Sequence, residues 1–119
     1  MLCFPVTIAW SHIVYQGDST VATAGDRHKV YVNGVQQINA NTSSITPQNA
    51  TTNIIKNGNT TYIGRDTDSS SYYFDGYLAE MNVIDGSIVA PTEFGETVDG
   101  VWIPKEYSGN YGNNGFFLP

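Results

Sequence analysis

Tyrosine and asparagine side chains gather in two short stretches whose chemistry suits sugar binding. Tyr72 and Tyr73 follow a serine turn, and a terminal loop holds the other members of the set, which are Tyr107, Asn110, Tyr111, Asn113 and Asn114. Flat rings stack on the apolar faces of sugars, and amide groups pair with the hydroxyls. These seven residues are candidate ligand contacts. The alternative, which the sequence leaves open for Tyr107 and Tyr111 and favours for Trp102, is that the aromatic rings pack the rim of the fold or contact another protein.

Asp66 and Asp68 occupy alternate positions of a serine-rich loop and are candidate calcium ligands. Carboxylates and backbone carbonyls are the oxygen ligands that Ca²⁺ prefers. An EF-hand is excluded, because its sixth position would be Ser71 in place of glycine and its twelfth Tyr77 in place of glutamate. The favoured interpretation is that Asp66 and Asp68 are solvated carboxylates of a turn. No cofactor is therefore predicted with certainty, and calcium binding is left as an open alternative.

The acidic residues do not predict catalysis. Hydrolysis of a glycosidic bond uses two carboxylates about 5 to 9 Å apart. Glu80 and Asp85 are separated by five positions, which places them on opposite faces of a regular strand, and Asp75 lies in a turn five positions before Glu80. We therefore predict that the chain is not an enzyme.

Trp10 and His12 lie two residues apart on one face of the first predicted strand. We interpret both as core or near-core residues, with the histidine hydrogen-bonded to backbone. His28 is the only other histidine, and two isolated histidines do not make a zinc site.

Composition restricts the partners. The chain has 119 residues, enough for one domain, and carries 11 acidic against 5 basic residues. The formal charge of -6 disfavours nucleic acid and anionic membranes. Cys3 is the single cysteine, which excludes an intrachain disulfide. The apolar opening residues lack a basic segment, so no signal peptide is predicted, and no apolar run reaches the ~18 residues of a membrane span.

The elements that must position these residues read as β-strands. Alternation over residues 6–15 predicts an interior strand, and Asn33-Gly34 between apolar runs predicts a hairpin with a type I′ turn. Residues 39–59 read as a long loop and residues 60–65 as a short strand. A long strand is expected over residues 72–84, with a β-bulge near Ala79 and Glu80 that restores the apolar register. Residues 91–94 suit one helical turn, and residues 99–119 form two apolar pieces around an aromatic, glycine-rich loop.

Five blocks in this order carry a family resemblance: AWSHIVYQGD, DRHKVYVNG, TYIGRD, FDGYLAEMNVIDG and GVWIPKEYSGNYGNNGFFL. Together they resemble the laminin G-like branch of the concanavalin A-like lectin/glucanase superfamily, in versions found in bacteriophage tail-fibre and other virion proteins. The resemblance implies an all-β, antiparallel two-sheet jelly-roll sandwich, here a single domain over residues 1–119 with residues 99–119 as a C-terminal extension. It also implies a binding or adhesion role, commonly towards carbohydrate.

Such domains have further strands before the W-x-H-I-V strand, so we expect a partial sandwich that is completed by another copy or another virion polypeptide. The expected function is a non-enzymatic virion adhesion module with carbohydrate binding, located on the phage particle and made in the host cytoplasm. The alternatives are a purely structural subunit whose aromatic loops contact neighbouring virion proteins and, more distantly, a glycan-degrading enzyme.

Overall fold

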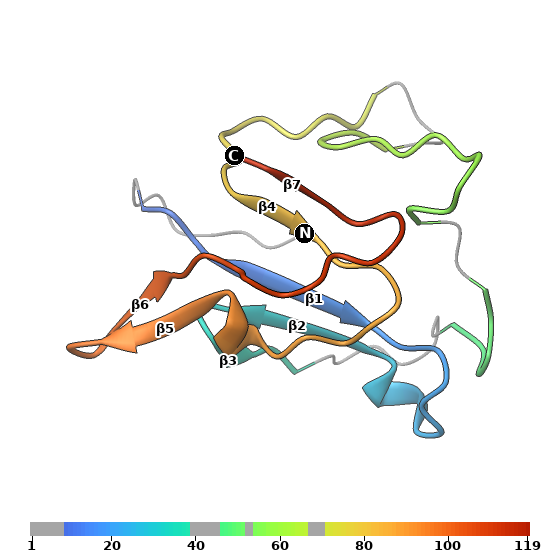
Figure 1. The fold of residues 1–119 in the computed structure, drawn as a ribbon, viewed down its shortest axis with the longest axis horizontal. Helices are drawn as coiled ribbons and strands as arrows, with labels where there is room; N and C mark the ends of the chain where they lie inside the picture. Colours follow the sequence, from blue (N-terminus) through green and yellow to red (C-terminus); the bar gives the residue numbers. More distant parts are fainter. Residues whose placement is uncertain (1–8, 39–45, 52–53, 67–70) are drawn as a thin grey trace.

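A computed structural model describes residues 9–38, 46–51, 54–66 and 71–119. Within these residues the regular elements are short strands and two single 3-10 turns (Figure 1). In chain order they are β1 (Ile13–Gly17), η1 (Ala24–Asp26), β2 (His28–Val32), β3 (Val35–Gln36), β4 (Met81–Val83), η2 (Pro91–Glu93), β5 (Gly95–Val98), β6 (Val101–Pro104) and β7 (Phe116–Leu118). The prediction of an all-β fold with one short helical turn near residue 91 is confirmed.

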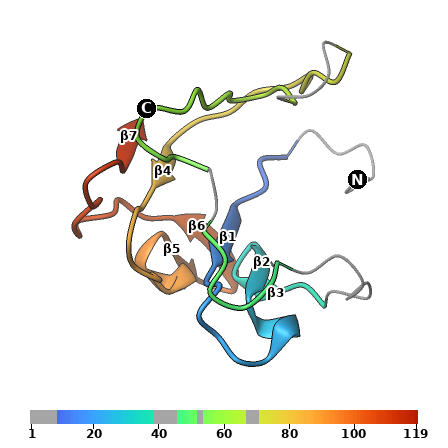
Figure 2. The same ribbon diagram turned by 90° about the vertical axis from the view of Figure 1, so that its right-hand side faces the viewer.

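The strands form three small antiparallel sheets. One has the order β1-β2-β3, and the others are the pairs β4-β7 and β5-β6. Figures 1 and 2 place the β5-β6 hairpin beside the β1-β2-β3 sheet, with the β4-β7 pair beyond it. This arrangement is that of a partial two-sheet sandwich.

The hairpin turn between β2 and β3 follows the prediction. Asn33 and Gly34 have φ values of 49° and 80°, which are the positive values of a type I′ turn. β2 pairs with β3 through Tyr31 with Gln36 and Val32 with Val35. A side chain at Gly34 would also meet the ring of Trp102, at 2.5 Å, so glycine is required there twice over.

The first strand is shorter than predicted and begins at Ile13, opposite Val32. Beyond that pair the partner chain turns at Asn33, so the ladder has no further strand to follow. In place of further strand pairing, Asn33 makes two hydrogen bonds to His12, here called the clamp. Oδ1 of Asn33 accepts from the backbone amide of His12 at 2.9 Å, and the backbone amide of Asn33 donates to the His12 carbonyl at 2.8 Å. The start of the predicted strand, residues 6–8, lies outside the described residues.

The long bulged strand predicted over residues 72–84 is wrong in extent, because only Met81–Val83 is a strand. β7 offers it just three partners, and Glu80 adopts a φ of 53°, outside the extended region. The strand predicted over residues 60–65 is reduced to one bridge between Arg65 and Tyr73.

Residues 62–66 and 71–80 run antiparallel to each other and stand away from the sheets in both views, and we call them the arm (Figures 1 and 2). Beside the bridge, the Phe74 amide donates to the Gly64 carbonyl at 2.7 Å. The guanidinium of Arg65 lies 4.4 Å from the centre of the Tyr62 ring. These local contacts hold the arm together, while most of its apolar side chains remain exposed.

The core of the described residues is small. Val14 and Phe94 are its buried apolar side chains, and Arg27 is buried with them. The Arg27 guanidinium donates to the carbonyls of Val21 and Ala22 and, at 3.0 Å, to that of Thr46. The charge is therefore compensated by carbonyl dipoles that fix the loops around η1.

Candidate functional site

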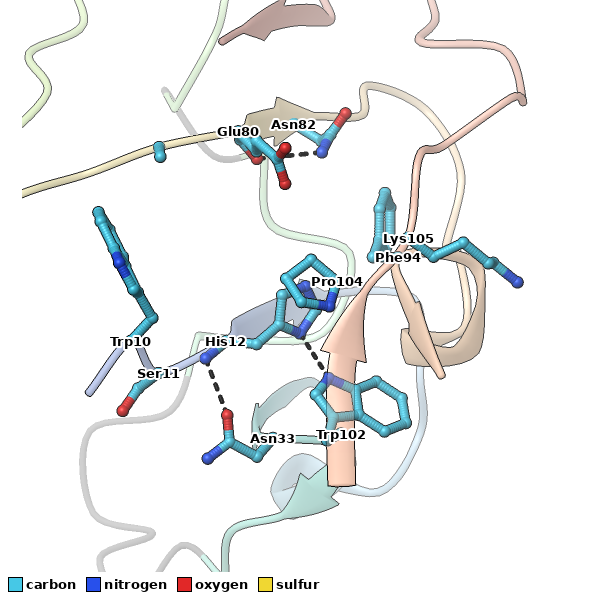
Figure 3. A pocket seen from close by; sticks show the side chains of 11 residues that line it. Trp10, Ser11, His12, Asn33, Glu80, Asn82, Phe94, Trp102, Pro104 and Lys105 are labelled. Carbon is cyan, nitrogen blue, oxygen red and sulfur yellow. Dashed lines mark hydrogen bonds between the residues drawn. The ribbon is translucent and has the colours of Figure 1, made fainter. Parts of the chain in front are cut away.

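A cleft of about 360 Å³ opens where four parts of the chain meet (Figure 3). The segment before β1, the β2-β3 turn, the start of β4 and the β5-β6 hairpin supply its walls. The lining residues are Trp10, Ser11, His12, Asn33, Ala79, Glu80, Asn82, Phe94, Trp102, Pro104 and Lys105. The volume lies at the lower end of the range of small-molecule sites.

A hydrogen bond between two rings forms the floor of the cleft. The indole N–H of Trp102 donates to Nδ1 of His12 at 3.0 Å, with the ring centres 5.9 Å apart. Trp102 also packs against Gly34 and Gly95, where any side chain would collide with the indole. Because Nδ1 accepts, the proton of neutral His12 sits on Nε2.

Burial lowers the pKa of His12 below its ordinary value of 6.5, and the negative charge of Glu80 acts in the opposite, weaker sense. Desolvation disfavours the charged imidazolium, and the donated indole N–H favours the neutral ring as well. The floor of the cleft is therefore neutral near pH 7.

Trp10 supplies the largest accessible apolar surface of the cleft. Its side chain is 70% exposed, and Figure 3 shows it at one side of the cavity, with Trp102 at the other. Glu80, just before β4, and Asn82, within β4, line the same space. The side-chain amide of Asn82 donates to the backbone carbonyl of Glu80 at 3.2 Å, so this bond does not occupy the Glu80 carboxylate.

This set of groups suits a neutral polyhydroxylated ligand. A flat indole can stack on the apolar face of a sugar ring, while a carboxylate, amides and a hydroxyl meet its hydroxyl groups. Among the described residues of the lining, Lys105 is the one cation and Glu80 the one carboxylate. The polar groups needed for orientation are thus present beside an apolar platform.

The terminal loop brings together three of the predicted contact residues, Tyr107, Asn110 and Tyr111. Tyr107 and Tyr111 meet edge to face, with ring centres 5.2 Å apart, and Phe94 packs on Tyr107 at 4.8 Å. The hydroxyl of Tyr111 donates to Oδ1 of Asn82 at 2.9 Å, and that of Tyr107 donates to the Asn110 carbonyl at 3.1 Å. Both rings are half-buried, so their contacts tie the loop to β4 and to Phe94 at the end of η2.

Asparagine side chains of the same loop also make structural bonds. Oδ1 of Asn110 accepts from the Gly112 amide at 2.8 Å. Asn114 donates to one carboxylate oxygen of Asp85 through both its amide groups, at 3.2 and 2.9 Å. Asn113 is exposed. The loop is therefore a support for the cleft through Asn82, and its role as a glycan contact stays a prediction.

The remaining candidates lie in or beside the arm. Tyr72 and Tyr73 are both exposed there, and among the described residues no ring contact or hydrogen bond joins them to the terminal loop. Asp66 donates its amide to the Tyr72 carbonyl at 3.1 Å. Asp68 lies outside the described residues, so the calcium prediction is untested.

The interpretation of Trp10 as a core residue is wrong, because the strand begins only at Ile13 and its indole projects from the chain before it. His12 is half-buried, but its ring bonds an indole, not backbone. Sequence reasoning also missed Asn33 and Glu80 as members of one cleft. The sequence signal that could have predicted the cleft was the spacing of Trp10 and His12 on one face of the predicted strand, together with the Asn-Gly turn that follows in the chain.

Two negative findings hold for the described parts of the chain. No group of three or more histidine, cysteine or acidic side chains is placed to hold a metal ion there. No helix in those parts is long and apolar enough to cross a membrane.

Comparison with known proteins identifies the family. A family model described as the concanavalin A-like lectin/glucanases superfamily matches residues 5–91, from the chain before β1 to the start of η2. No curated protein matches the chain, and no solved structure does. Since the match spans most of the chain and the strands form a partial sandwich, this protein belongs to the concanavalin A-like lectin/glucanase superfamily.

Proposed function

We propose that the chain is a carbohydrate-binding module without enzymatic activity, which acts in adhesion at the surface of a bacteriophage particle. Membership of a lectin-like superfamily supports carbohydrate binding. The virion role rests on the resemblance of the five sequence blocks to tail-fibre and related proteins. Fold alone does not carry the proposal, so it has to rest on a site.

The exposed indole of Trp10 beside the polar groups of the cleft carries the proposal. An aromatic platform 70% open to solvent at the mouth of a cavity is where stacking on a sugar ring gains most. The formal charge of -6 and the carboxylate of Glu80 favour a neutral sugar over an anionic one.

The carboxylates support binding over hydrolysis. Glu80 is the single carboxylate that the described part of the chain contributes to the cleft, whereas a glycosidase uses two. Asp85, the other acid near β4, accepts two hydrogen bonds from Asn114. A release assay for reducing ends with polysaccharide substrates tests this part, and any release that Glu80→Gln abolishes would establish an enzyme.

The binding experiment is titration calorimetry with neutral mono- and oligosaccharides first selected on a glycan array. Trp10→Ala removes the platform, and we expect the affinity to fall about tenfold or more, since stacking contributes on the order of 1 kcal/mol beyond the buried area. Tyr77→Ala is the matched control, because Tyr77 is an aromatic side chain 87% exposed in the arm and outside the cleft. Absence of binding at millimolar sugar, or equal losses in the two variants, would refute the proposal.

The arm favours a second candidate, a structural subunit that contacts neighbouring virion proteins. Its exposed large side chains are Tyr62, Ile63, Tyr72, Tyr73, Phe74, Tyr77 and Leu78. Contiguous exposed apolar surface of this kind marks protein contacts. This candidate predicts no sugar binding and loss of assembly on Tyr77→Ala. Tyr111→Ala is a poorer probe, because it breaks the bond to Asn82 that supports β4.

A further inference from the structure

Glu80 holds a backbone conformation that its residue type disfavours. Its φ is 53°, in the left-handed region, where a residue with a side chain is strained. Strained residues persist only where the surrounding structure holds them, and they cluster at binding sites. Glu80 lines the cleft, directly before β4. A glutamate in this conformation at a cleft therefore needs contacts that keep it there.

Asn82 supplies those contacts. Its side-chain nitrogen donates to the Glu80 carbonyl at 3.2 Å, and its Oδ1 accepts from the hydroxyl of Tyr111 at 2.9 Å. Asn82 is itself fixed in β4, where it pairs with Phe117 of β7. The Asp85 amide also donates to the Tyr111 carbonyl at 2.9 Å, which ties the terminal loop to the end of β4. The loop, Asn82 and Glu80 thus form one chain of hydrogen bonds.

The carboxylate of Glu80 makes no hydrogen bond and no ion pair within the part of the chain that the structure describes. Lys105, the cation of the same lining, points away from it in Figure 3. Burial lowers the pKa of His12 and the charge of Glu80 opposes that effect, so the carboxylate lies within electrostatic range of a neutral ring. An ionised carboxylate only accepts hydrogen bonds. Its complement is therefore a ligand group that donates one.

A sugar hydroxyl is such a donor. When the apolar face of a sugar stacks on the exposed indole of Trp10, the hydroxyls remain at the rim of the ring, free to meet polar groups. A hydrogen bond to a carboxylate is about twice as strong as one between neutral groups. Stacking alone does not distinguish sugars that share an apolar face, whereas a site that bonds one hydroxyl rejects the analogue without it. The carboxylate is thus the group that can select among neutral sugars.

We propose that Glu80 is the specificity-determining residue of the cleft: its carboxylate accepts a hydrogen bond from one free hydroxyl of a neutral hexose stacked on Trp10, and Asn82 and Tyr111 are the positioning residues that hold it. The inference rests on the proposed carbohydrate binding and deepens it. A hexose in which that hydroxyl is removed binds poorly, and an anionic sugar is disfavoured by like charge.

Titration calorimetry tests the proposal with the methyl glycosides of glucose, galactose, mannose and N-acetylglucosamine, and with the monodeoxy analogues of the one that binds best. One deoxy analogue should bind wild type about tenfold more weakly than its parent. Glu80→Ala should weaken binding of the parent by the same factor and leave that analogue unchanged. Glu96→Ala is the matched control, because Glu96 is an exposed glutamate of β5 outside the lining, and it should change neither.

Tyr111→Phe tests the positioning role, because it removes the hydroxyl that bonds Asn82 and keeps the ring. The parent glycoside should bind about threefold more weakly, and the sensitive deoxy analogue should be unaffected. In a Glu80→Ala background the same substitution should have no further effect, a coupling that a general structural role would not produce. Tyr107→Phe is the matched control, because its hydroxyl bonds the Asn110 carbonyl within the loop.

The outcomes separate this inference from the function on which it rests. Binding that Trp10→Ala weakens, but that Glu80→Ala and Glu96→Ala affect equally, would overturn the inference and leave carbohydrate binding in place. Additive losses from Tyr111→Phe and Glu80→Ala would overturn the positioning roles. No binding of any of the four glycosides at millimolar concentration would also overturn the inference, and the glycan array then decides the proposed function.

Discussion

At the residue scale, His12 links parts of the protein that are far apart in the chain. Its backbone is clamped by Asn33 and its ring accepts the indole N–H of Trp102, 90 positions away. The neutral ring is the form that fits, since a proton on Nδ1 would face the indole proton. The state of one imidazole therefore bears on the contact between β1 and β6.

We predict that acid weakens the fold through this group. The pKa of His12 in the folded protein lies below 6.5, so the unfolded chain takes up the proton first. The stabilising effect is complete above about pH 6.5 and is lost as the pH falls towards the folded pKa. Urea unfolding at pH 7.5, 6.5 and 5.5 measures this loss.

His12→Gln is the control for the pH experiment, because a glutamine carbonyl can accept the same indole N–H without titrating. The variant should lose the decline in stability between pH 6.5 and 5.5 that wild type shows. Parallel curves for the two proteins would contradict the assignment.

At the element scale, two turns have the same backbone conformation but differ in how closely other side chains pack against them. Asn33-Gly34 and Asp99-Gly100 both have positive φ values at both positions, with the glycines at 80° and 79°. A side chain at Gly34 would meet Trp102 at 2.5 Å, whereas one at Gly100 would meet nothing within 4 Å. Substitutions at Gly34 and Gly100 therefore separate two costs in stability, that of a positive φ and that of a steric clash with Trp102.

We expect Gly100→Ala to cost about 1 to 2 kcal/mol in the free energy of unfolding, the price of positive φ alone. Gly34→Ala should cost about 1 to 3 kcal/mol more, because Trp102 must shift out of its packed position. Denaturant unfolding with tryptophan fluorescence measures both. Equal losses would show that the contact with Trp102 does not constrain the turn.

Local rules explain which elements the sequence predicted well. The Asn-Gly hairpin and the turn at Pro91 depend on neighbouring residues only, and both are confirmed. The strand over residues 72–84 depended on a partner, and β7 supplies one for three residues alone. The hairpin of β5 and β6 went unpredicted although Asp99-Gly100 is a turn signal, because Gly95 to Val98 lacks apolar alternation.

The cleft was beyond the reach of sequence for the same reason. Glu80 enters it through a positive φ, and Trp102 closes it from another sheet. Neither position follows from periodicity. The order of sequence blocks predicted the superfamily, while the site depends on contacts between them.

At the scale of the whole molecule, stability should depend on concentration. If association with another copy buries the exposed side chains of Ile13, Tyr15 and Val35 in the folded state alone, mass action stabilises the fold as the chain concentration rises. We predict that the thermal midpoint increases between about 5 and 500 µM, by several degrees for a domain of this size. Differential scanning calorimetry measures it.

Val35→Thr should flatten that dependence, since it weakens association more than it disturbs the folded chain. Val101→Lys, at a valine 61% exposed on β6, should retain it. A midpoint that does not move with wild-type concentration would mean that the chain folds without help from association.

The packing of Trp102 on the Asn33-Gly34 turn has a kinetic consequence. The hairpin closes through a two-residue loop, an event of about 1 to 10 µs. Trp102 packs on the same turn but lies far from it in the sequence. Contacts of such long sequence separation form slowly, because the loop entropy is lost before the contact is gained. We therefore expect the turn to form before the indole of Trp102 packs on it, so that burial of the indole reports a late step of folding.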